Sequence, residues 1–277
     1  MQEKAKVIIP SQKTHAVEEA VFVIKFPSPL SEDQLKKALS LQEELKEIFP
    51  RIVQKINPGL QLKIEKGGSP QFSDPGQKLT GVIFERFKTD ATPEKIISVE
   101  GFHIAFHCFN YSRWKNVWPE ARRFLKKLID EISISPVELL ALSVRDCFIF
   151  NGSFEEFDPA LVFRKDSLFL VQNVFSIRNL WHSHHGFFEL SDNKIVEKDL
   201  LVTNISTEAD SSSKMKIRID CFFESRLKPP GLMAEELFSD DKNLIDEIFN
   251  ILHTKNKKIL NKIITPETAA SICLEVK

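Results

Sequence analysis

The chain contains few of the residues that break regular structure. Its 277 residues include nine glycines and fourteen prolines, together below the roughly 12% of average usage. Aromatic residues with a polar tip are also scarce, with one tyrosine and three tryptophans against 23 phenylalanines. Phenylalanine has no polar group to use at a wet recognition surface, so most of these rings should be buried. The composition therefore predicts mostly regular structure around an aromatic core.

Cysteine is sparse and shows no metal or redox spacing. Cys108, Cys147, Cys221 and Cys273 are widely separated, and the first three lie within apolar runs. None of them forms a CxxC pair. We interpret them as reduced thiols of a cytoplasmic protein.

Neither charge nor apolar runs point to nucleic acid or to a membrane. Lysine and arginine (38) almost balance aspartate and glutamate (39), which leaves a net charge of −1 and no general field. The stretch from Met1 to Gln12 lacks the apolar segment of a secretory signal. No run approaches the roughly 18 apolar residues of a transmembrane helix. We expect no membrane contact and a cytoplasmic location.

Common catalytic and nucleotide-binding motifs are missing. Gly67-Gly68 lacks the spacing of a dinucleotide fingerprint or a P-loop, and the sequence contains no GxSxG elbow and no HExxH helix. This weakens the interpretation as an enzyme without excluding it.

The first part of the chain predicts a strand, a helix and a meander. A β-rich run at residues 20–26 ends at Pro27. Ser31 and Gln34 have the spacing of a capping box, which opens an amphipathic helix that reaches Pro50. Short apolar runs separated by turn residues then predict antiparallel strands at residues 60–64, 80–87, 95–99 and 103–109.

A second long amphipathic helix is predicted from Ser112 to about Glu131. Pro119 falls inside it, so this helix either kinks there or begins near Pro119 after a separate turn. Pro136 then introduces the apolar run Val137–Phe150, which we expect to be a buried strand of the central sheet.

The rest of the chain repeats this pattern in outline. It predicts strands at residues 160–163, 168–177, 181–190, 199–207 and 215–224, and a closing helix within residues 240–264. We therefore expect an α+β fold of two similar lobes, residues 1–152 and 153–277, each a mainly antiparallel sheet packed against a long helix. The lobes would form one compact unit, sharing a sheet or packing side by side.

Six short stretches follow one another in a distinctive order between residues 16 and 268. They are Glu18–Phe26, Tyr111–Trp114, Leu142–Arg145, Ile217–Asp220, Leu252-His253 and Ile264-Thr265. In this order they resemble the "EAV" strand, the Tyr-x-x-Trp helix start, the "LRYIN" and "DID" strands and the closing "LH" and "IT" of a sporadically distributed bacterial family of uncharacterised proteins. The resemblance implies a fold and a bacterial, cytosolic setting but no particular reaction.

Some family positions differ in this chain. Asp146 and Phe148 stand where the family has the Tyr and Asn of "RYIN", and Arg218 replaces the first Asp of "DID". The resemblance therefore implies no role for these three positions in this chain. The family's patchy distribution suggests an association with defence or mobile elements.

Two pairs of histidines are candidate metal ligands. His182 and His184 are two residues apart in a predicted strand, and His103 and His107 are four apart in another, so each pair shares one face. A four-histidine site would form if these strands were neighbours. No Asp or Cys stands beside them at ligand spacing, so exposed or hydrogen-bonded structural histidines are the alternative.

The second long helix carries a basic face. Its candidate contacts for an anion or a partner are Arg113, Arg122, Arg123, Lys126 and Lys127. The closing helix adds Lys255, Lys257, Lys258 and Lys262. If both faces lay on one side they would form a positive patch for an acidic protein or nucleic acid, whereas ordinary solvated helix faces are the alternative.

Arg145 and Asp146 interrupt an otherwise apolar strand. A buried charge is costly unless it is paired, so we expect Arg145 to pair with Asp220 and Asp146 with Arg218. Alternatively, the four residues line a ligand cleft between the lobes, because perturbed charges also mark functional sites.

Three classes of function remain compatible with the sequence. The first is a non-catalytic interaction protein that binds another protein or itself, with a link to bacterial defence or toxin neutralisation and no cofactor. The second is a metal-dependent hydrolase or nuclease that uses the histidines and a divalent metal. Nucleic-acid binding through the basic helix is a third, weaker hypothesis.

Overall fold

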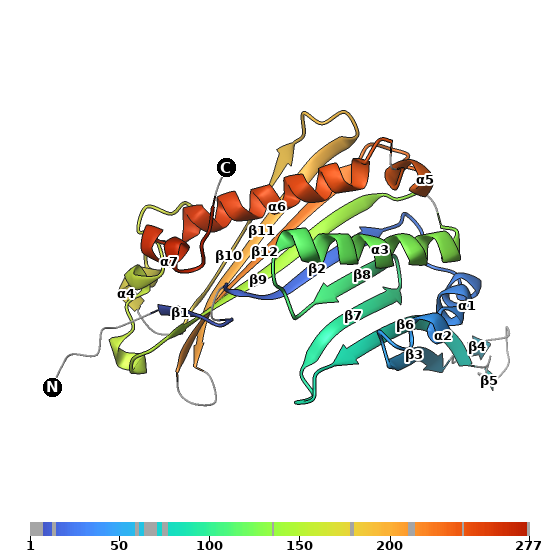
Figure 1. The fold of residues 1–277 in the computed structure, drawn as a ribbon, viewed down its shortest axis with the longest axis horizontal. Coiled ribbons are helices and arrows are strands. Elements are labelled where there is room, and N and C mark those ends of the chain that lie inside the picture. The colour runs from blue at the N-terminus through green and yellow to red at the C-terminus, as the bar shows by residue number, and fades with distance from the viewer. Residues whose placement is uncertain are drawn as a thin grey trace.

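A computed structural model describes residues 8–12, 15–58, 61–63, 71–73, 77–134, 136–177, 180–209, 214–239 and 241–275. It has an α+β fold built on a large antiparallel sheet (Figure 1). The strands are β1 (Ile8–Pro10), β2 (Val17–Lys25), β3 (Arg51–Pro58), β4 (Gln61–Lys63), β5 (Gln71–Ser73), β6 (Gln77–Phe87), β7 (Pro93–Glu100), β8 (His103–Cys108), β9 (Leu139–Phe150), β10 (His182–Leu190), β11 (Val196–Ala209) and β12 (Met215–Leu227). The helices are α1 (Glu32–Ser40), α2 (Gln42–Leu45), α3 (Trp114–Ile132), α4 (Val174–Ile177), α5 (Ala234–Leu237), α6 (Leu244–Ile263) and α7 (Pro266–Ser271).

One ten-stranded sheet spans both halves of the chain. Its order is β10-β11-β12-β9-β2-β8-β7-β6-β3, with β1 paired to β9, and the short strands β4 and β5 pair with each other. The boundary expected near residue 152 falls just after β9, whose neighbours are β2 from the start of the chain and β12 from its second half. The halves therefore share a sheet.

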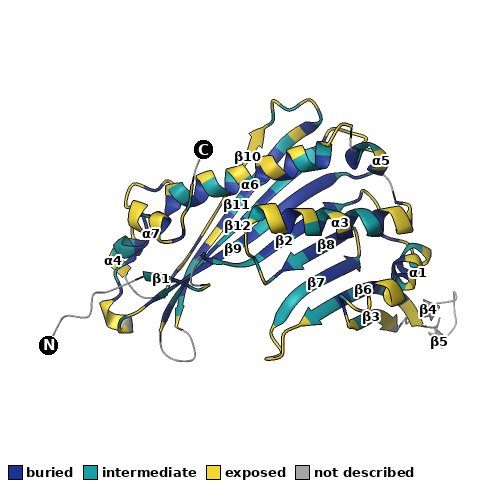
Figure 2. Ribbon diagram, viewed as in Figure 1, coloured by how far each residue is buried: buried dark blue, intermediate teal, exposed yellow. Residues whose placement is uncertain are grey.

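The two long helices lie on the same face of this sheet (Figure 1). The Phe22 ring, in the central strand β2, contacts Trp114 and Trp118 of α3 and Phe249 of α6, with ring centroids 5.5 to 5.7 Å apart. Side chains alternate along each strand, so β12 buries every second residue. The aromatic core lies between this sheet face and the inner sides of α3 and α6 (Figure 2).

Most predicted elements are confirmed. The strands at 20–26, 80–87, 95–99, 103–109, 137–150, 181–190, 199–207 and 215–224 and the closing helix are present within a few residues. The capping box joins Ser31 and Gln34 as expected. The run at 60–64 lies partly outside the described residues, and Gly67 and Gly68 lie wholly outside them.

The two amphipathic helices differ in detail from the prediction. The first is divided at Leu41 into α1 and the single turn α2. The second begins at Trp114, so Pro119 lies inside α3 and does not start it. A proline this close to the amino end removes a backbone hydrogen bond only from the first turns of the helix. Burial of the apolar stripe along the rest of α3 offsets this loss.

The strands expected at residues 160–163 and 168–177 are wrong. Pro159 begins a 3-10 turn (Pro159–Leu161) that Asp158 caps through the backbone N–H of Ala160. Residues 174–177 form the short helix α4. A buried Phe163 ring packs on Trp181 with centroids 5.5 Å apart, so these apolar residues fill space beside the sheet without joining it. Strands β1, β3 and β5 were not predicted.

In the part of the chain that the structure describes, no helix is both long enough and apolar enough to cross a membrane.

Candidate ligand-binding site

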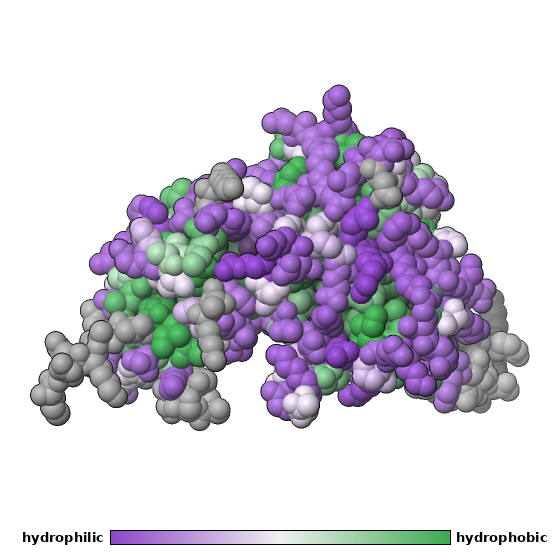
Figure 3. Space-filling model, viewed as in Figure 1, coloured by the Kyte–Doolittle hydropathy of each residue, from purple (hydrophilic) through white to green (hydrophobic). Residues whose placement is uncertain are grey.

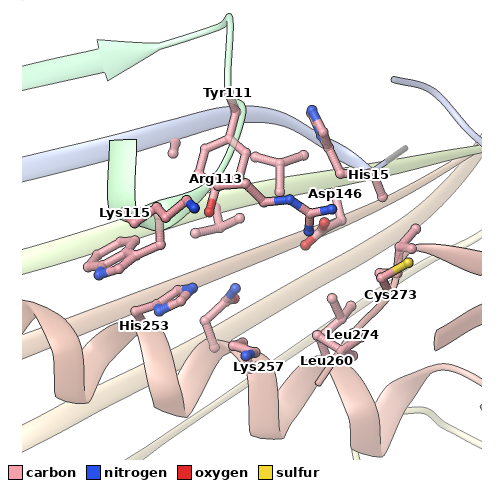
Figure 4. A pocket seen from close by; sticks show the side chains of 17 residues that line it. His15, Tyr111, Arg113, Lys115, Asp146, His253, Lys257, Leu260, Cys273 and Leu274 are labelled. Atoms are coloured by element: carbon pink, nitrogen blue, oxygen red, sulfur yellow. The ribbon is translucent and has the colours of Figure 1, made fainter. Parts of the chain in front are cut away.

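A cavity of about 370 Å³ lies on the helix-covered side of the sheet (Figure 4). Its floor comes from the start of β2 and the middle of β9, and its walls come from the start of α3, from α6 and from the segment after α7. Figure 4 shows Arg113 and Lys115 on one wall and His253 and Lys257 on the facing wall. A volume of this size suits a small organic molecule.

Two buried side-chain oxygens in this cavity lack a hydrogen-bond partner. They are Oδ2 of Asp146 and Oδ1 of Asn256. The His15 ring lines the same space and hydrogen-bonds to the backbone of Tyr111 and Val17. Leaving such an atom unpaired inside a protein costs roughly 1 to 3 kcal/mol, and native proteins contain few of them. Their convergence is the expected property of a site that a ligand completes.

Asp146 lies in the cavity because of the alternation along β9. Its side chain is on the helix face, and its cross-strand neighbours are Ile219 on β12 and Val17 on β2, which offer no polar side chain. It is 1% exposed. Burial, followed by the charge of Asp220, raises the pKa of Asp146 to about 7. Near neutral pH this carboxyl can therefore donate or accept a hydrogen bond.

The mouth of the cavity is cationic. Arg113 and Lys115 are exposed at the start of α3, and Lys257 is half-buried on α6. Within the described chain, none of the three forms an ion pair. Burial lowers the pKa of His253 to about 4, so this neighbour is neutral at physiological pH. Three cations thus face one carboxyl, and the site favours an anion.

Aromatic rings form one side of the cavity. The rings of Trp114 and His253 stack in parallel, with centroids 4.1 Å apart and an interplanar angle of 1°. The indole N–H of Trp114 donates to Oδ1 of Asn250 at 2.8 Å, which fixes this stack. Tyr111 lines the same space, and burial, followed by the charge of Asp146, raises its pKa. The wall is therefore rigid and flat.

The expected pairing of the charged residues on β9 is half right. Arg145 donates to Asp220 at 2.6 Å and to Glu19 at 3.0 Å, so its predicted partner is confirmed. The pair of Asp146 with Arg218 is wrong, because these side chains lie on opposite faces of the sheet. Arg218 instead binds Glu208 at 2.6 Å. Of the four residues, only Asp146 lines the cavity.

Most basic residues of α3 already have partners within the protein. Arg122 binds Asp246 at 2.9 Å, Lys126 binds Asp130 at 2.7 Å, and Lys127 binds Glu44 at 2.5 Å. The Arg123 guanidinium lies over the Phe124 ring, 4.6 Å from its centroid. On α6, Lys255 binds Asp199 and Glu189. The cations of the two helices that meet at the cavity are Arg113, Lys115 and Lys257.

The two histidine pairs lie far apart. Strands β11, β12, β9 and β2 separate β10, which carries His182 and His184, from β8, which carries His103 and His107. At about 4.8 Å per strand this is roughly 24 Å. His107 Nδ1 instead lies 2.9 Å from Glu19. No group of three or more potential metal ligands occurs among the described residues.

Sequence reasoning did not single out His15 or Asn256. Asn256 had a detectable signal, because it occupies an apolar stripe position of α6 between Leu252 and Leu260. Asn256 is 6% exposed and lines the cavity. His15 has no comparable local pattern, because only the folding of the segment before β2 brings it to the site.

No protein-family model matches this sequence, and no curated protein matches it significantly.

Proposed function

We propose that this protein acts by binding, and that its ligand is a small anion held in the cavity between the sheet, α3 and α6. The convergence of two unpaired buried oxygens, on Asp146 and Asn256, with three cations carries the proposal. Unsatisfied polar atoms would gain hydrogen bonds from a ligand, and the cations would neutralise its charge. The rigid aromatic wall supports recognition with little reorganisation.

The test is a thermal-shift screen of the full chain against small organic phosphates and carboxylates. A ligand that binds the folded state raises the melting temperature by an amount that grows with the logarithm of its concentration above Kd. The Lys115→Gln/Lys257→Gln variant should lose this stabilisation. A matched control, Lys37→Gln/Lys258→Gln, removes the same charge from exposed positions outside the cavity and should keep it. An absence of any anion-dependent shift, or an equal loss in both variants, contradicts the proposal.

A second candidate function is binding of a partner protein without catalysis. Six of the twelve large hydrophobic residues exposed among the described residues fall within residues 168–190. They are Leu168, Val171, Ile177, Leu180, Phe188 and Leu190. Figure 3 shows hydrophobic surface at the end of the molecule where α4 lies. Exposed apolar side chains favour a protein interface, and β10 is an edge strand of the described sheet whose outer backbone is available for pairing.

This second proposal predicts concentration-dependent association or capture of a specific partner. Phe188→Glu/Leu190→Glu changes side chains that are 65% and 90% exposed, so the fold should tolerate it. The variant should lose association measured by light scattering or by pull-down from the native host. Association that this variant retains rules out β10 as the interface.

The family resemblance is compatible with the ligand proposal. Tyr111, Trp114 and His253 belong to the motifs that carry the resemblance, and all three line the cavity. We also propose that the halves of the chain are related lobes. In support, α3 follows β8 and α6 follows β12, and these two strands flank the central pair β2 and β9.

A further inference from the structure

We infer that the ligand of the cavity is a nucleoside monophosphate, with its phosphate at the cationic mouth and its base against the buried polar atoms. This inference rests on the proposed function and names the chemical class of its ligand. Such a ligand requires a site with two parts, one that binds a dianion and one that binds a flat ring with hydrogen-bonding edges.

The mouth suits a phosphate. Arg113, Lys115 and Lys257 come from two helices and face one opening (Figure 4). Arginine presents a planar fork of donors, and lysine presents a compact charge, a combination that suits the three oxygens of a phosphate better than a single carboxylate. With Asp146 partly protonated near neutral pH, the excess of positive charge matches a dianion.

The interior suits the edge of a base. The carboxamide of Asn256 offers both donors and an acceptor, and the carboxyl of Asp146 can act as either near its pKa of about 7. Both side chains are at least 94% buried, since they are 6% and 1% exposed, and each has an unpaired oxygen in the cavity. Asparagine and acidic side chains recognise base edges through such paired hydrogen bonds.

The aromatic wall suits the face of a base. Trp114 and His253 already stack on each other, and a third flat ring can extend the stack or pack on its edge. Base-aromatic stacking contributes roughly 1 to 3 kcal/mol per base and tolerates any base. The cavity of about 370 Å³ is large enough for one nucleotide.

Cys273 provides a reporter at this site. Its thiol lines the cavity and is exposed, whereas Cys108, Cys147 and Cys221 are buried. Burial raises the pKa of Cys108 to about 11 and that of Cys147 to about 12, so these thiols should react slowly. An aromatic disulfide reagent should therefore modify Cys273 first. Cys273→Ser identifies this phase by removing it.

The experiment measures the rate of Cys273 modification in the full chain with adenosine, guanosine, cytidine or uridine monophosphate. We expect at least one of them to slow the reaction about tenfold at ten times its Kd. Ribose 5-phosphate, the free nucleosides and inorganic phosphate should slow it much less. Asn256→Leu should weaken protection by the nucleotide, and Lys257→Gln should do the same, while the adjacent exposed Lys258→Gln should not.

The outcomes separate this inference from the proposal beneath it. Equal protection by ribose 5-phosphate overturns the base site and leaves an organic phosphate as ligand. Protection by dicarboxylates alone overturns the nucleotide but keeps anion binding. Stronger protection by a short 5′-phosphorylated oligonucleotide overturns a free nucleotide in favour of a strand end. No protection by any anion contradicts the inference and the proposed function together.

Discussion

Arg145 and Asp146 are neighbours in the sequence, yet they lie on opposite faces of the sheet in opposite electrostatic environments. Arg145 is held between Glu19 and Asp220 on the face without the long helices. Asp146 is buried under α6 with one oxygen unpaired. The same strand therefore contributes an ion pair to one face and a buried carboxyl that lines the cavity to the other.

The first prediction concerns the pH dependence of stability. The pKa of Asp146 is about 7 in the folded protein, against about 3.9 in an unfolded chain. The folded state therefore binds more protons between these values, and this residue lowers the free energy of unfolding as pH rises from about 4 to about 7. The full cost above that range is of order 4 kcal/mol. Asp146→Asn should be more stable than the native protein at about pH 8, and this advantage should vanish near pH 4.

Urea unfolding of both proteins across this range measures the difference. His253 contributes with the opposite sign, because its pKa is lowered to about 4 and its stabilisation is lost as pH falls below about 6.5. It is present in both proteins, so the difference between them isolates Asp146. An advantage of Asp146→Asn that does not change with pH would show that the carboxyl is not buried in its ionised form.

The second prediction concerns the charges on the other face. The Arg145 side chain is 41% exposed, so solvent screens its pair with Asp220. A double-mutant cycle with Arg145→Met and Asp220→Asn should give a coupling free energy of about 1 kcal/mol, which falls in high salt. Neither variant should weaken anion binding in the cavity. Loss of binding in Arg145→Met with an unchanged melting temperature would place this residue in the site instead.

The third prediction concerns the contact between the two long helices. Asp246 on α6 accepts from the indole N–H of Trp118 at 2.5 Å and from Arg122 at 2.9 Å. Asp246→Ala leaves both donors without this partner, so we expect a loss of about 2 to 3 kcal/mol in chemical unfolding. Asp246→Asn keeps an acceptor and should recover about half of that loss. Equal stability of the two variants would show that the hydrogen bonds contribute little.

Periodicity carried most of the fold prediction. The alternation of β12 and the apolar stripe of α6 are strong enough to identify these elements from sequence alone. The strands predicted within residues 160–177 are absent because apolar side chains such as Phe163 pack from loops and turns. No local sequence pattern distinguishes a buried apolar loop from a buried strand.

The candidate site was harder to predict because it is assembled from distant segments. His15, Asp146 and Asn256 are more than 100 residues apart, and only the pairing of β2 with β9 and the packing of α6 bring them together. Arg113 was identified as an anion contact from the basic face of α3, but the sequence could not show that Arg122, Lys126 and Lys127 are neutralised.

The last prediction concerns metal. His182 and His184 lie on an edge strand opposite Ser206 and Asn204, which are poor ligands for zinc. Four strands separate this pair from the other histidine pair, and two imidazoles are too few for a closed zinc site. Elemental analysis of protein purified without a histidine tag should therefore find no stoichiometric zinc or manganese, and His182→Ala/His184→Ala should leave the metal content unchanged. A metal present at one equivalent and lost in this variant would restore the hydrolase hypothesis. Such a metal site would require a third ligand supplied by another molecule.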